Sequence, residues 1–331
     1  MAALAPPVAA IRVAVRRALT GLPADGPVLV ACSGGADSLA LAAATAFVAP
    51  RLGLPAGLVT VDHGLQEGSA ERAGAVARWA VEAGLAPVEA VPVTVAGRPG
   101  GPEAAAREAR YQALVDAARR HDAAALLVGH TRDDQAETVL LALTRGAGPR
   151  GLAGMPERRE LDGVPLLRPL LDVTRDETRK ACAALGLTPW EDPHNADPSY
   201  ARARVRTDVL PVLLRALGPG VLDNLARTAR LVAADTAALD DLAAAALAGP
   251  VGVRAVDGGL SVAALAGLAP AVRTRVLHAW ARELGASGAA LSHRHVTALD
   301  ALVTDWRGQG ATHLPGGLRV ARRGGRLIRV D

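Results

Sequence analysis

The chain has 331 residues, of which 50% are hydrophobic, and it carries a formal net charge of +4. This length suits one large domain and a smaller second domain. No apolar run is long enough to span a membrane, and Cys32 and Cys182 lie too far apart for a zinc or CxxC motif. We therefore expect no membrane segment, no cysteine-ligated metal site and a location in the reducing cytoplasm.

The basic residues are unevenly distributed along the chain. All of them are arginines except Lys180. Residues 1–215 are balanced in charge, whereas residues 216–331 contain 13 basic and 9 acidic side chains, with most of the excess after Trp306. A basic C-terminal part favours a polyanionic partner such as a nucleic acid.

The first predicted element is a helix near the N-terminus. Ile11, Val15, Leu19 and Leu22 recur at helical spacing and predict an amphipathic helix that packs on the body of the protein. The arginines of this segment also fit a transit peptide, but the apolar stripe favours the packed helix.

A phosphate-binding loop is predicted directly after the first strand. The apolar run 27–33 predicts a buried strand, and a helix follows from about Asp37 to Val48. Between them, the glycines allow backbone N–H groups to converge on an anion, where the helix dipole adds positive potential. The loop has no lysine after its last glycine, so it is not a Walker A loop. Its candidate ligands for a nucleotide are Ser33, Gly34, Gly35, Asp37 and Ser38, with Asp37 as the candidate Mg²⁺ ligand.

Strand-like and helical segments alternate through the first 130 residues. We expect an α/β fold, a parallel sheet with helices on both faces, because this alternation is typical of βαβ units. In such sheets, ligands bind at the carboxyl ends of the strands. Three polar strand ends therefore point at one crevice: the phosphate loop, Asp62–Gly64 with His63, and Gly129–His130. The expected strands are 27–33, 57–62, 88–95 and 124–130, and the helices between them are 37–48, 69–83 and 102–120.

An acidic motif follows the fourth strand. On a helix, Asp134 and Glu137 share a face, and His130 lies one turn before Asp134. An acidic first turn that complements the helix dipole would explain one of these residues. The combination favours a site that binds a metal ion or a cationic substrate.

Two arginine-containing segments are further candidates. Glu103, Arg107, Arg110 and Tyr111 fall near one helical face; an exposed ion pair and an arginine that binds a nucleotide phosphate explain them equally well. In the polar segment 191–206, acids precede arginines at every second position, including Arg202, Arg204 and Arg206. A solvated loop is the simpler explanation, but such arginines can also clamp phosphates. Gly146–Gly151 matches GxGxxG in letters only, because it follows a helix and contains a proline, and we expect a tight loop there.

The C-terminal part has a different pattern. Thr174 and Glu177 predict a capping box that opens a helix to about Leu185, after a strand at 165–171. A helix near 207–217 follows, and Gly218–Gly220 predicts a boundary between domains 1–217 and 218–331. Beyond the boundary we expect helices near 221–247, 272–284 and 293–303, and a basic hairpin from Pro315 to Val330 with its turn at Gly324–Gly325.

Taken together, these motifs resemble the tRNA(Ile)-lysidine synthases, a branch of the PP-loop ATP pyrophosphatases. The resemblance covers roughly residues 28–210 and is carried by the strings SGGADS, VDHGL, EAAAREARYQAL, GHTRDDQAETVLLALTRGAGPRGLAGM, LLRPLL and WEDPHNADPSYARARVR. The basic end LPGGLRVARRGG is similar to the first C-terminal domain of this family. The chain resembles the short form, which lacks a second C-terminal domain.

The resemblance implies a specific reaction. ATP would adenylate O2 of the wobble cytidine (position 34) of a tRNA-Ile with a CAU anticodon, and the amine of free L-lysine would then attack C2, giving lysidine, AMP and pyrophosphate. It implies ATP as cosubstrate and Mg²⁺ as cofactor, and it leaves the assembly open between a monomer and a homodimer. The implied roles are: nucleotide binding by the phosphate loop, His63, Gly129 and His130; lysine binding by Asp134 and Glu137; and binding of phosphates or the anticodon base by Arg107, Arg110, Arg204 and Arg206, with Asp37, Asp134, Arg107 and Arg204 as the catalytic set.

Two alternatives remain open at this stage, one within the same superfamily and one from another class. A tRNA 2-thiocytidine synthetase is another PP-loop enzyme, but sulfur transfer requires paired reactive cysteines, and Cys32 and Cys182 form a poor pair. A non-catalytic module that binds ATP and RNA would bind ATP without releasing pyrophosphate, and the presence of both Asp37 and Glu137 argues against it.

Overall fold

The computed structural model describes residues 4–62, 64, 68–94, 102–192, 197–249, 252–255, 258–288 and 290–330, with only the backbone of 102–104. The chain divides into two compact units, Met1–Leu231 and Val232–Asp331. The boundary between them falls inside the long helix α10 (Val221–Ala248), whereas the boundary expected from the sequence, at Gly218, lies in the loop before that helix.

The first unit is built on a six-stranded sheet with the order β3-β2-β1-β4-β6-β5. Neighbouring strands are parallel except for β5, which pairs with β6 in antiparallel fashion and forms one edge. The predicted α/β fold with a parallel sheet is therefore confirmed, and the edge strand β5, which was not predicted, adds one antiparallel pair. The strands are β1 (Val28–Ala31), β2 (Ala56–Asp62), β3 (Val88–Pro92), β4 (Ala125–Val128), β5 (Arg158–Leu161) and β6 (Val164–Leu167).

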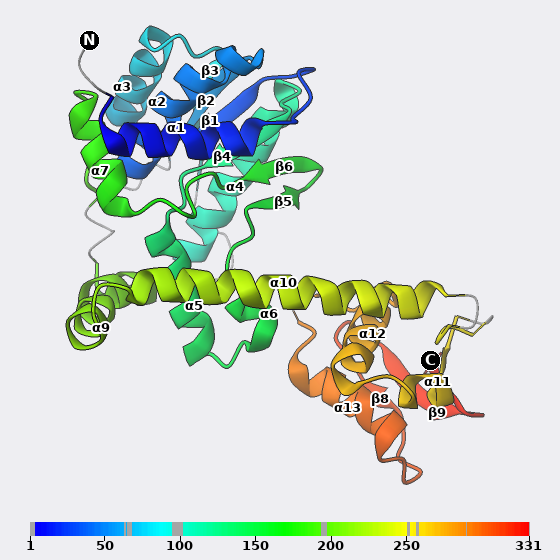
Figure 1. Ribbon diagram of the computed structural model, residues 1–331. Coiled ribbons are helices and arrows are strands. Elements are labelled where there is room, and N and C mark those ends of the chain that lie inside the picture. The colour runs from blue at the N-terminus through cyan, green and yellow to red at the C-terminus, as the bar shows by residue number, and fades with distance from the viewer. Residues whose placement is uncertain are drawn as a thin grey trace. The chain divides into compact units, whose positions relative to one another are not determined.

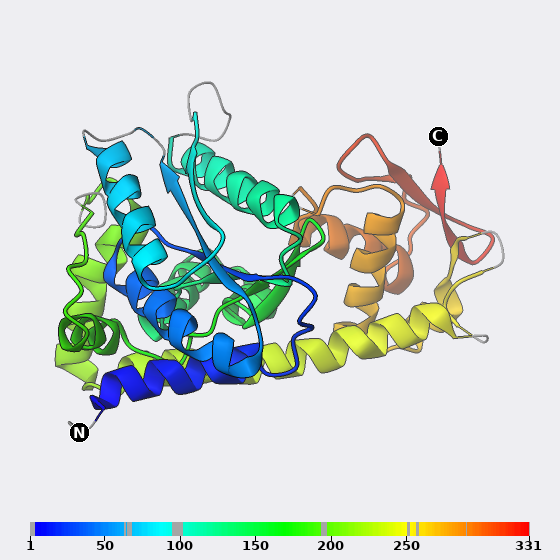
Figure 2. The same ribbon diagram turned by 90° about the horizontal axis from the view of Figure 1, so that it is seen from above.

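Helices cover both faces of this sheet (Figures 1 and 2). One face carries α1 (Pro6–Leu19), α2 (Ala36–Val48), α3 (Ser69–Glu82) and α7 (Arg175–Ala184), which share one apolar core. The other face carries α4 (Pro102–Arg120), which packs through Tyr111, Leu114, Val115 and Ala118 on a second core.

The first helix shows how the apolar pattern determines packing. Ile11, Val15 and Leu19 are at most 1% exposed on the inner side of α1, so the predicted packed amphipathic helix is confirmed. On the same face of the sheet, α7 begins with the predicted capping box of Thr174 and Glu177. Lys180 lies on the exposed side of α7, with its ammonium 2.7 Å from Asp176 Oδ2.

The segment after Tyr200 differs from the prediction. We expected polar loop up to Arg206, but a helical run begins at Ala201 and continues through α8 (Ala201–Arg204), the π-helical turn η3 (Val205–Val209) and α9 (Leu210–Leu217). No proline occurs between Pro198 and Pro211, and alanine and arginine are good helix formers, so the helix starts earlier than the polar character suggested. The remaining elements of this unit are η1 (Pro50–Leu52), α5 (Arg132–Thr144) and α6 (Gly148–Leu152).

The second unit combines helices with a small antiparallel sheet of order β7-β10-β9-β8. The predicted basic hairpin is confirmed, since β9 (Arg319–Arg323) and β10 (Arg326–Val330) pair across Gly324–Gly325. The hydrophobic core of the second unit surrounds Trp280, which is 1% exposed. The other elements are the C-terminal part of α10, β7 (Leu260–Ser261), α11 (Val262–Ala266), α12 (Pro270–Glu283), α13 (His293–Thr304) and β8 (Thr312–His313).

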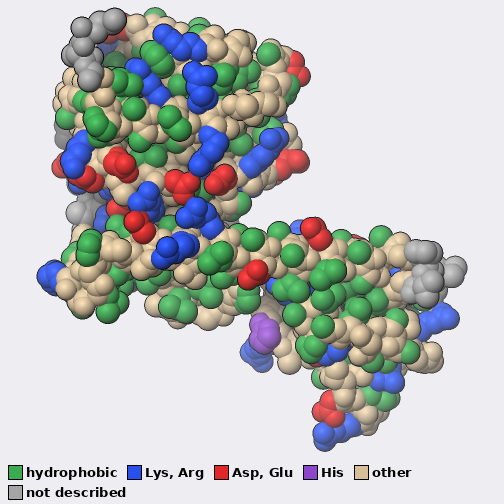
Figure 3. All heavy atoms as spheres, viewed as in Figure 1, with side chains coloured by type: hydrophobic (Ala, Val, Ile, Leu, Met, Phe, Trp, Pro, Cys, Tyr) green, Lys and Arg blue, Asp and Glu red, His purple; other side chains and the backbone are tan. Residues whose placement is uncertain are grey.

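Two further properties concern the lengths of the helices and the charges on the surface. None of the helices among the described residues has the length and apolarity needed to cross a lipid bilayer. On the face shown in Figure 3, acidic and basic side chains of the first unit are interspersed instead of forming one patch of a single sign.

Candidate active site

A cavity of about 710 Å³ opens at the carboxyl ends of β1, β2 and β4 in the first unit. Residues of the phosphate loop form one wall, α4 contributes Arg110 and Leu114, and α7 contributes Arg175 and Arg179. The sequence predicted that strand ends converge on one crevice, and this is observed for β1 and β4. From β2, Val59 and Val61 line the cavity. Other lining residues are Gly129, His130, Asp134, Trp190, Asp192, Arg206 and Thr207.

The loop between β1 and α2 has the geometry of an anion cradle. Gly34 has a φ of +84°, a conformation that favours glycine, and α2 begins directly after Gly35. The Ser38 hydroxyl accepts a hydrogen bond from the Ser33 backbone N–H (3.2 Å) and donates one to the Gly35 carbonyl (2.9 Å), so it braces the loop. The N-terminus of α2 is thus directed at the cavity, where an anion would be stabilised.

Gly129 brings the end of β4 against the start of α2. A Cβ atom at this position would lie 3.0 Å from the backbone carbon and oxygen of Asp37 and 3.1 Å from the nitrogen of Ser38. Real Cβ atoms rarely approach backbone so closely, so a side chain here would push the two elements apart. Gly129 therefore positions the loop by its lack of a side chain.

Asp37 is a partly buried carboxylate beside the phosphate loop. Its Oδ1 accepts a hydrogen bond from the Thr178 hydroxyl, and its Oδ2 lies 3.8 Å from Arg175 Nε. Burial is the main influence and raises the pKa of Asp37 to about 6; the Thr178 hydrogen bond opposes this rise but does not cancel it. A carboxylate with too little positive charge around it is suited to accept a cation.

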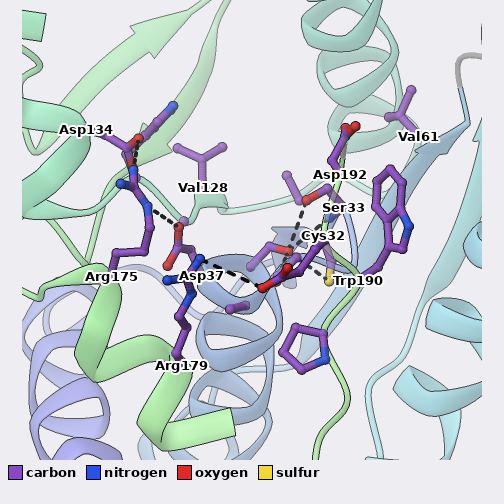
Figure 4. A pocket seen from close by; sticks show the side chains of 18 of the residues that line it. Cys32, Ser33, Asp37, Val61, Val128, Asp134, Arg175, Arg179, Trp190 and Asp192 are labelled. Carbon is purple, nitrogen blue, oxygen red and sulfur yellow. Dashed lines mark hydrogen bonds and ion pairs between the residues drawn. The ribbon is translucent and has the colours of Figure 1, made fainter. Parts of the chain in front are cut away.

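Four carboxylates converge on the guanidinium of Arg175, and Figure 4 shows two of them, those of Asp37 and Asp134. Its Nη2 donates to Asp134 Oδ1 at 3.0 Å and to Glu137 Oε1 at 3.2 Å. Asp37 and Asp133 lie farther away, each with an oxygen 3.8 Å from the guanidinium. Asp37 and Glu137 therefore belong to one site. The sequence did not identify Arg175, which follows the capping residue Thr174 and was attributed only to the start of a helix.

The helical conformation after Tyr200 decides which arginines reach the acidic cluster. Arg202 and Arg206 are four residues apart and share a face: Arg206 Nε and Nη2 donate to the two oxygens of Glu137 (2.8 and 3.1 Å), and Arg202 Nε lies 3.5 Å from Glu137 Oε2. Arg204 lies between them in sequence and turns away, donating to the carbonyls of Pro198 and Ser199. Glu137 is fully buried behind these groups and does not line the cavity, whereas Asp134 and Arg206 do.

Asp134 also caps its own helix. Its Oδ2 accepts hydrogen bonds from the backbone N–H (2.8 Å) and the hydroxyl (2.9 Å) of Thr131, which completes a capping box at the start of α5. Burial alone would raise the pKa of Asp134, but Arg175 and the Thr131 hydrogen bonds outweigh burial and lower it. Asp134 therefore caps its own helix and also belongs to the charged cluster, so both explanations that the sequence offered for it apply.

His130 lies at the end of β4 on the cavity wall. Its Nδ1 accepts a hydrogen bond from Arg168 Nε at 3.3 Å. Burial lowers the pKa of His130 well below its ordinary value, and Arg168 and Arg110 lower it further. The imidazole is therefore neutral at physiological pH.

Arg107, Arg110 and Tyr111 of α4 are grouped as the sequence predicted, but only Arg110 lines the cavity. The guanidiniums of Arg107 and Arg110 lie 5.1 and 5.4 Å from the centre of the Tyr111 ring. Glu103 has no described side chain, so the suggested pair with Arg107 lies outside the described residues, as does His63.

One aromatic residue at the cavity was not predicted as part of the site. The backbone N–H of Trp190 donates to the Gly34 carbonyl at 3.0 Å, and Arg72 lies over its indole ring at 4.2 Å. Figure 4 shows Trp190 at the end of the pocket near Val61. The GxGxxG-like segment forms a turn at Gly146 and the short helix α6, which packs on α5.

The residues around Asp37 fit Mg²⁺ held jointly with nucleotide phosphates. Mg²⁺ usually takes one or two carboxylates and completes its octahedron with phosphate oxygens and waters. Asp37 supplies a hard oxygen ligand next to the anion cradle. Among the described residues no group of three or more His, Cys, Asp or Glu could hold a metal ion, so these residues would need phosphate oxygens or waters to complete the coordination.

Comparison with known proteins places this site in a family. A model of the PP-loop domain matches residues 12–213, and a model of the TilS substrate binding domain matches residues 260–328. The tRNA(Ile)-lysidine synthase of Salinispora arenicola (strain CNS-205) is 79% identical over 331 residues, which cover all of this chain and 98% of that protein. The chain belongs to the tRNA(Ile)-lysidine synthase family. The tRNA(Ile)-lysidine synthase of Thermobifida fusca (strain YX) is 57% identical over 98% of this chain and 97% of its own.

A solved structure supports the fold of this tRNA(Ile)-lysidine synthase family member. The U34-tRNA thiolase NcsA from Methanococcus maripaludis superimposes with a TM-score of 0.54 at 21% identity, over 68% of this chain and 80% of that chain. At this level of identity the likeness concerns the fold alone. The relatives named above are tRNA(Ile)-lysidine synthases, and burial raises the pKa of both thiols here, that of Cys182 to about 11, which favours the protonated form. The 2-thiocytidine synthetase alternative is therefore disfavoured.

Proposed function

We propose that this chain uses ATP to join free L-lysine to C2 of the cytidine at position 34 of a tRNA-Ile with a CAU anticodon. In the first step, O2 of the cytidine attacks the α-phosphorus of ATP and pyrophosphate leaves. In the second step, the lysine amine attacks C2 and loses a proton, and AMP leaves with the electrons of the C2–O2 bond. The product is lysidine, and the chain acts as an ATP-dependent ligase.

One observation carries the proposal beyond family membership. Arg175 contacts Asp37 beside the phosphate loop and also contacts the acids Asp134 and Glu137. A nucleotide at the loop and an ammonium at the acids would thus lie next to each other in one cavity. This juxtaposition supports a reaction in which an adenylate forms and an amine attacks it within the same site.

The phosphate loop would bind the ATP phosphates. The N-terminus of α2 and the backbone around Gly34 and Gly35 supply positive potential where negative charge develops on the leaving pyrophosphate. Asp37 would hold the Mg²⁺, which neutralises phosphate charge when bound. Arg179, which lines the same wall, is 63% exposed and able to turn toward the phosphates.

The acidic cluster would bind the lysine ammonium groups. Asp134 is directly accessible from the cavity, whereas Arg206 occupies both oxygens of Glu137, so an ammonium that reaches Glu137 must displace Arg206. With every group ionised the four acids exceed the three arginines by one charge, which the Mg²⁺ at Asp37 would neutralise; the remaining acids and arginines balance, so an ammonium would bind by replacing a guanidinium at Asp134 or Glu137. This balance is between Asp37, Asp133, Asp134 and Glu137 on one side and Arg175, Arg202 and Arg206 on the other.

The contacts of Gly129, His130 and Arg204 support their predicted roles to different degrees. Gly129 and His130 border the cavity, and because Nδ1 accepts from Arg168, the neutral imidazole has its proton on Nε2, which could donate a hydrogen bond to a nucleotide. Arg204 makes only local backbone contacts, so its geometry gives no support for a catalytic role. A location in the cytoplasm, where tRNA, ATP and lysine occur together, is part of the proposal.

The direct test combines the protein with ATP, Mg²⁺, radiolabelled lysine and tRNA that carries CAU. We expect label in the tRNA, with one AMP and one pyrophosphate per lysine, and no label when cytidine 34 is replaced by uridine. Asp37→Asn should abolish labelling, while Asp25→Asn, an exposed carboxylate of the same unit, should retain it. Pyrophosphate release without lysine transfer, or incorporation of sulfur, would contradict the proposal; sedimentation of the same sample distinguishes a monomer from a homodimer.

A further inference from the structure

A buried threonine contacts the candidate Mg²⁺ ligand from behind the cavity and has no role in the function proposed above. Thr178 lies on α7 and is 0% exposed, and the residues that line the cavity do not include it. Its hydroxyl donates a hydrogen bond to Oδ1 of Asp37 in the first turn of α2. Asp37 does line the cavity, with 26% of its side chain exposed. Thr178 therefore acts on a bound ligand only through Asp37.

The Thr178 hydroxyl has one proton and two acceptors within reach. Oγ1 lies 2.8 Å from the carbonyl oxygen of Arg175, three residues earlier on α7, and it also contacts Oδ1 of Asp37. The Arg175 carbonyl belongs to the helix and accepts a backbone hydrogen bond there. A hydrogen bond to a carboxylate is about twice as strong as one to a neutral oxygen, so the proton is directed to Asp37.

The two carboxylate oxygens of Asp37 have different surroundings. Oδ1 accepts from Thr178, whereas within the described part of the chain Oδ2 accepts no hydrogen bond. Arg175 Nε lies 3.8 Å from Oδ2, beyond hydrogen-bonding distance. The same guanidinium donates to Asp134 and Glu137 at 3.0 and 3.2 Å, so it is closer to those acids than to Asp37. Oδ2 is therefore the oxygen of Asp37 that remains for a cation.

Without a restraint, Asp37 would close on Arg175. A guanidinium and a carboxylate attract each other most strongly at about 2.7–2.9 Å, which is shorter than the present 3.8 Å. Rotation of the Asp37 side chain toward Arg175 would form this contact and would withdraw Oδ2 from a cation. The hydrogen bond from Thr178 opposes the rotation, and the hydroxyl keeps its place because α2 and α7 pack against each other in one apolar core.

We infer that Thr178 is a positioning residue that holds Asp37 away from Arg175 and keeps Oδ2 available to the Mg²⁺ bound with ATP. The inference deepens the function proposed above and rests on the role given there to Asp37. Thr178 contacts no substrate, so it acts by fixing the orientation of the carboxylate. If its hydroxyl only filled space in the core, valine, which has nearly the same shape, would replace it without loss of metal affinity.

The test measures how tightly Mn²⁺, which shares the oxygen ligands of Mg²⁺, binds to the protein with ATP. Because tRNA and lysine are left out, no reaction occurs, and free Mn²⁺ is measured by electron paramagnetic resonance. Thr178→Val should weaken Mn²⁺ binding about tenfold, the scale of one hydrogen bond to a charged group. Thr178→Ala should show the same loss, and Thr178→Ser, which keeps the hydroxyl, should recover most of the affinity.

Thr45→Val is the matched control. Thr45 on α2 is also 0% exposed, but its hydroxyl donates to the carbonyl of Leu41, at 2.8 Å. This variant should bind Mn²⁺ as the unmodified chain does. The affinity for metal-free ATP, measured in EDTA, should be unchanged in all of these variants, because the backbone donors of the phosphate loop are left in place. Unchanged ATP affinity also shows that the variants are folded.

Arg175→Gln tests the competition for Asp37 directly. In this background Thr178→Val should cost less Mn²⁺ affinity, because no guanidinium remains to attract the carboxylate. A loss of the same size would overturn the inference, and so would equal Mn²⁺ affinities of Thr178→Val and Thr45→Val. A loss of metal-free ATP affinity in Thr178→Val as large as the loss of Mn²⁺ affinity would also overturn it, because it would assign the threonine to the shape of the loop.

Two further measurements separate this inference from the proposed function. Asp37→Asn should lose at least as much Mn²⁺ affinity as Thr178→Val; an unchanged affinity would refute Asp37 as the metal ligand and the inference with it. Lysine incorporation into tRNA by the unmodified protein is measured separately, and its absence alongside the expected Mn²⁺ results would refute the ligase activity only.

Discussion

Arg206 forms a bidentate ion pair with Glu137, with Nε 2.8 Å from Oε1 and Nη2 3.1 Å from Oε2. The contact comes from the π-helical turn η3, a rare conformation that often occurs at functional sites. In the proposed reaction an incoming ammonium would use this acid, so the guanidinium of Arg206 would compete with lysine for it.

Arg206→Ala should therefore separate lysine binding from catalysis. Arg206 would compete with an ammonium for the buried Glu137, so its removal should lower the KM for lysine at least about fivefold, which corresponds to about 1 kcal/mol. The turnover number should fall, because the cavity wall loses a side chain that lines it. Steady-state kinetics with saturating ATP and tRNA measures both values.

Arg204→Ala provides the comparison for this experiment. It removes the same charge from the same helical run, but Arg204 contacts only backbone carbonyls. Its KM for lysine should stay within about twofold of the original value. A rise in the KM for lysine in Arg206→Ala would show that Arg206 assists binding instead of competing with it.

Asp37 should give the reaction an acid limb near pH 6. The carboxylate must be ionised to hold a cation, and burial raises its pKa to about 6, so kcat/KM for ATP should fall tenfold per pH unit below that value. Above pH 6 the ionised form destabilises the fold, because the unfolded chain ionises more readily, near pH 4. Asp37→Asn should therefore raise the free energy of unfolding by about 3 kcal/mol at pH 7.5 and change it little at pH 4. Equal effects at both pH values in urea titrations would contradict this.

Arg175 should control the titration of its neighbours. Arg175→Gln removes the positive charge near Asp37, so the pKa of that carboxyl should rise and the acid limb should move up by about one pH unit. Arg175→Lys keeps the charge but not the fork and should move the limb less. Arg179→Gln, one helical turn further along α7, should leave the limb where it is; a shift of the same size there would assign the effect to general electrostatics.

Thr131 should matter for both stability and acidity. Thr131→Ala removes the cap of α5 and should lower the free energy of unfolding by about 1–2 kcal/mol. Asp134 also loses a hydroxyl donor, so its lowered pKa should move back up, and lysine binding should weaken at mildly acidic pH before it does in the unmodified protein. Thr304→Ala, whose exposed hydroxyl donates to a carbonyl on α13, should be neutral in both measurements.

Much of the fold follows from local patterns in the sequence. The four parallel strands, the helices between them and the C-terminal hairpin were expected because apolar periodicity and glycine turns determine them locally. The strand β5 was not expected, since its sequence Arg158–Leu161 is polar and exposed, and only pairing with β6 makes it a strand.

Several residues of the site were predictable from sequence motifs, but the contacts between them were not. Asp37 and Asp134 were recognised from motifs, whereas Arg175 reaches them only because α7 packs beside α2. Arg202 was passed over in favour of Arg204, because the start of the helix at Ala201 fixes which arginines face Glu137, and helix starts are poorly encoded in a polar segment.

The single lysine of this chain has a practical consequence for labelling. The Lys180 ammonium is held by Asp176, and this hydrogen bond raises its pKa, so the amine stays protonated and reacts slowly at neutral pH. An amine-directed fluorophore applied at alkaline pH would attach to one defined ε-amino group on α7, besides the terminal amine. That helix also carries Arg175 and Arg179, so a dye at this point would report on events in the cavity without an engineered attachment site.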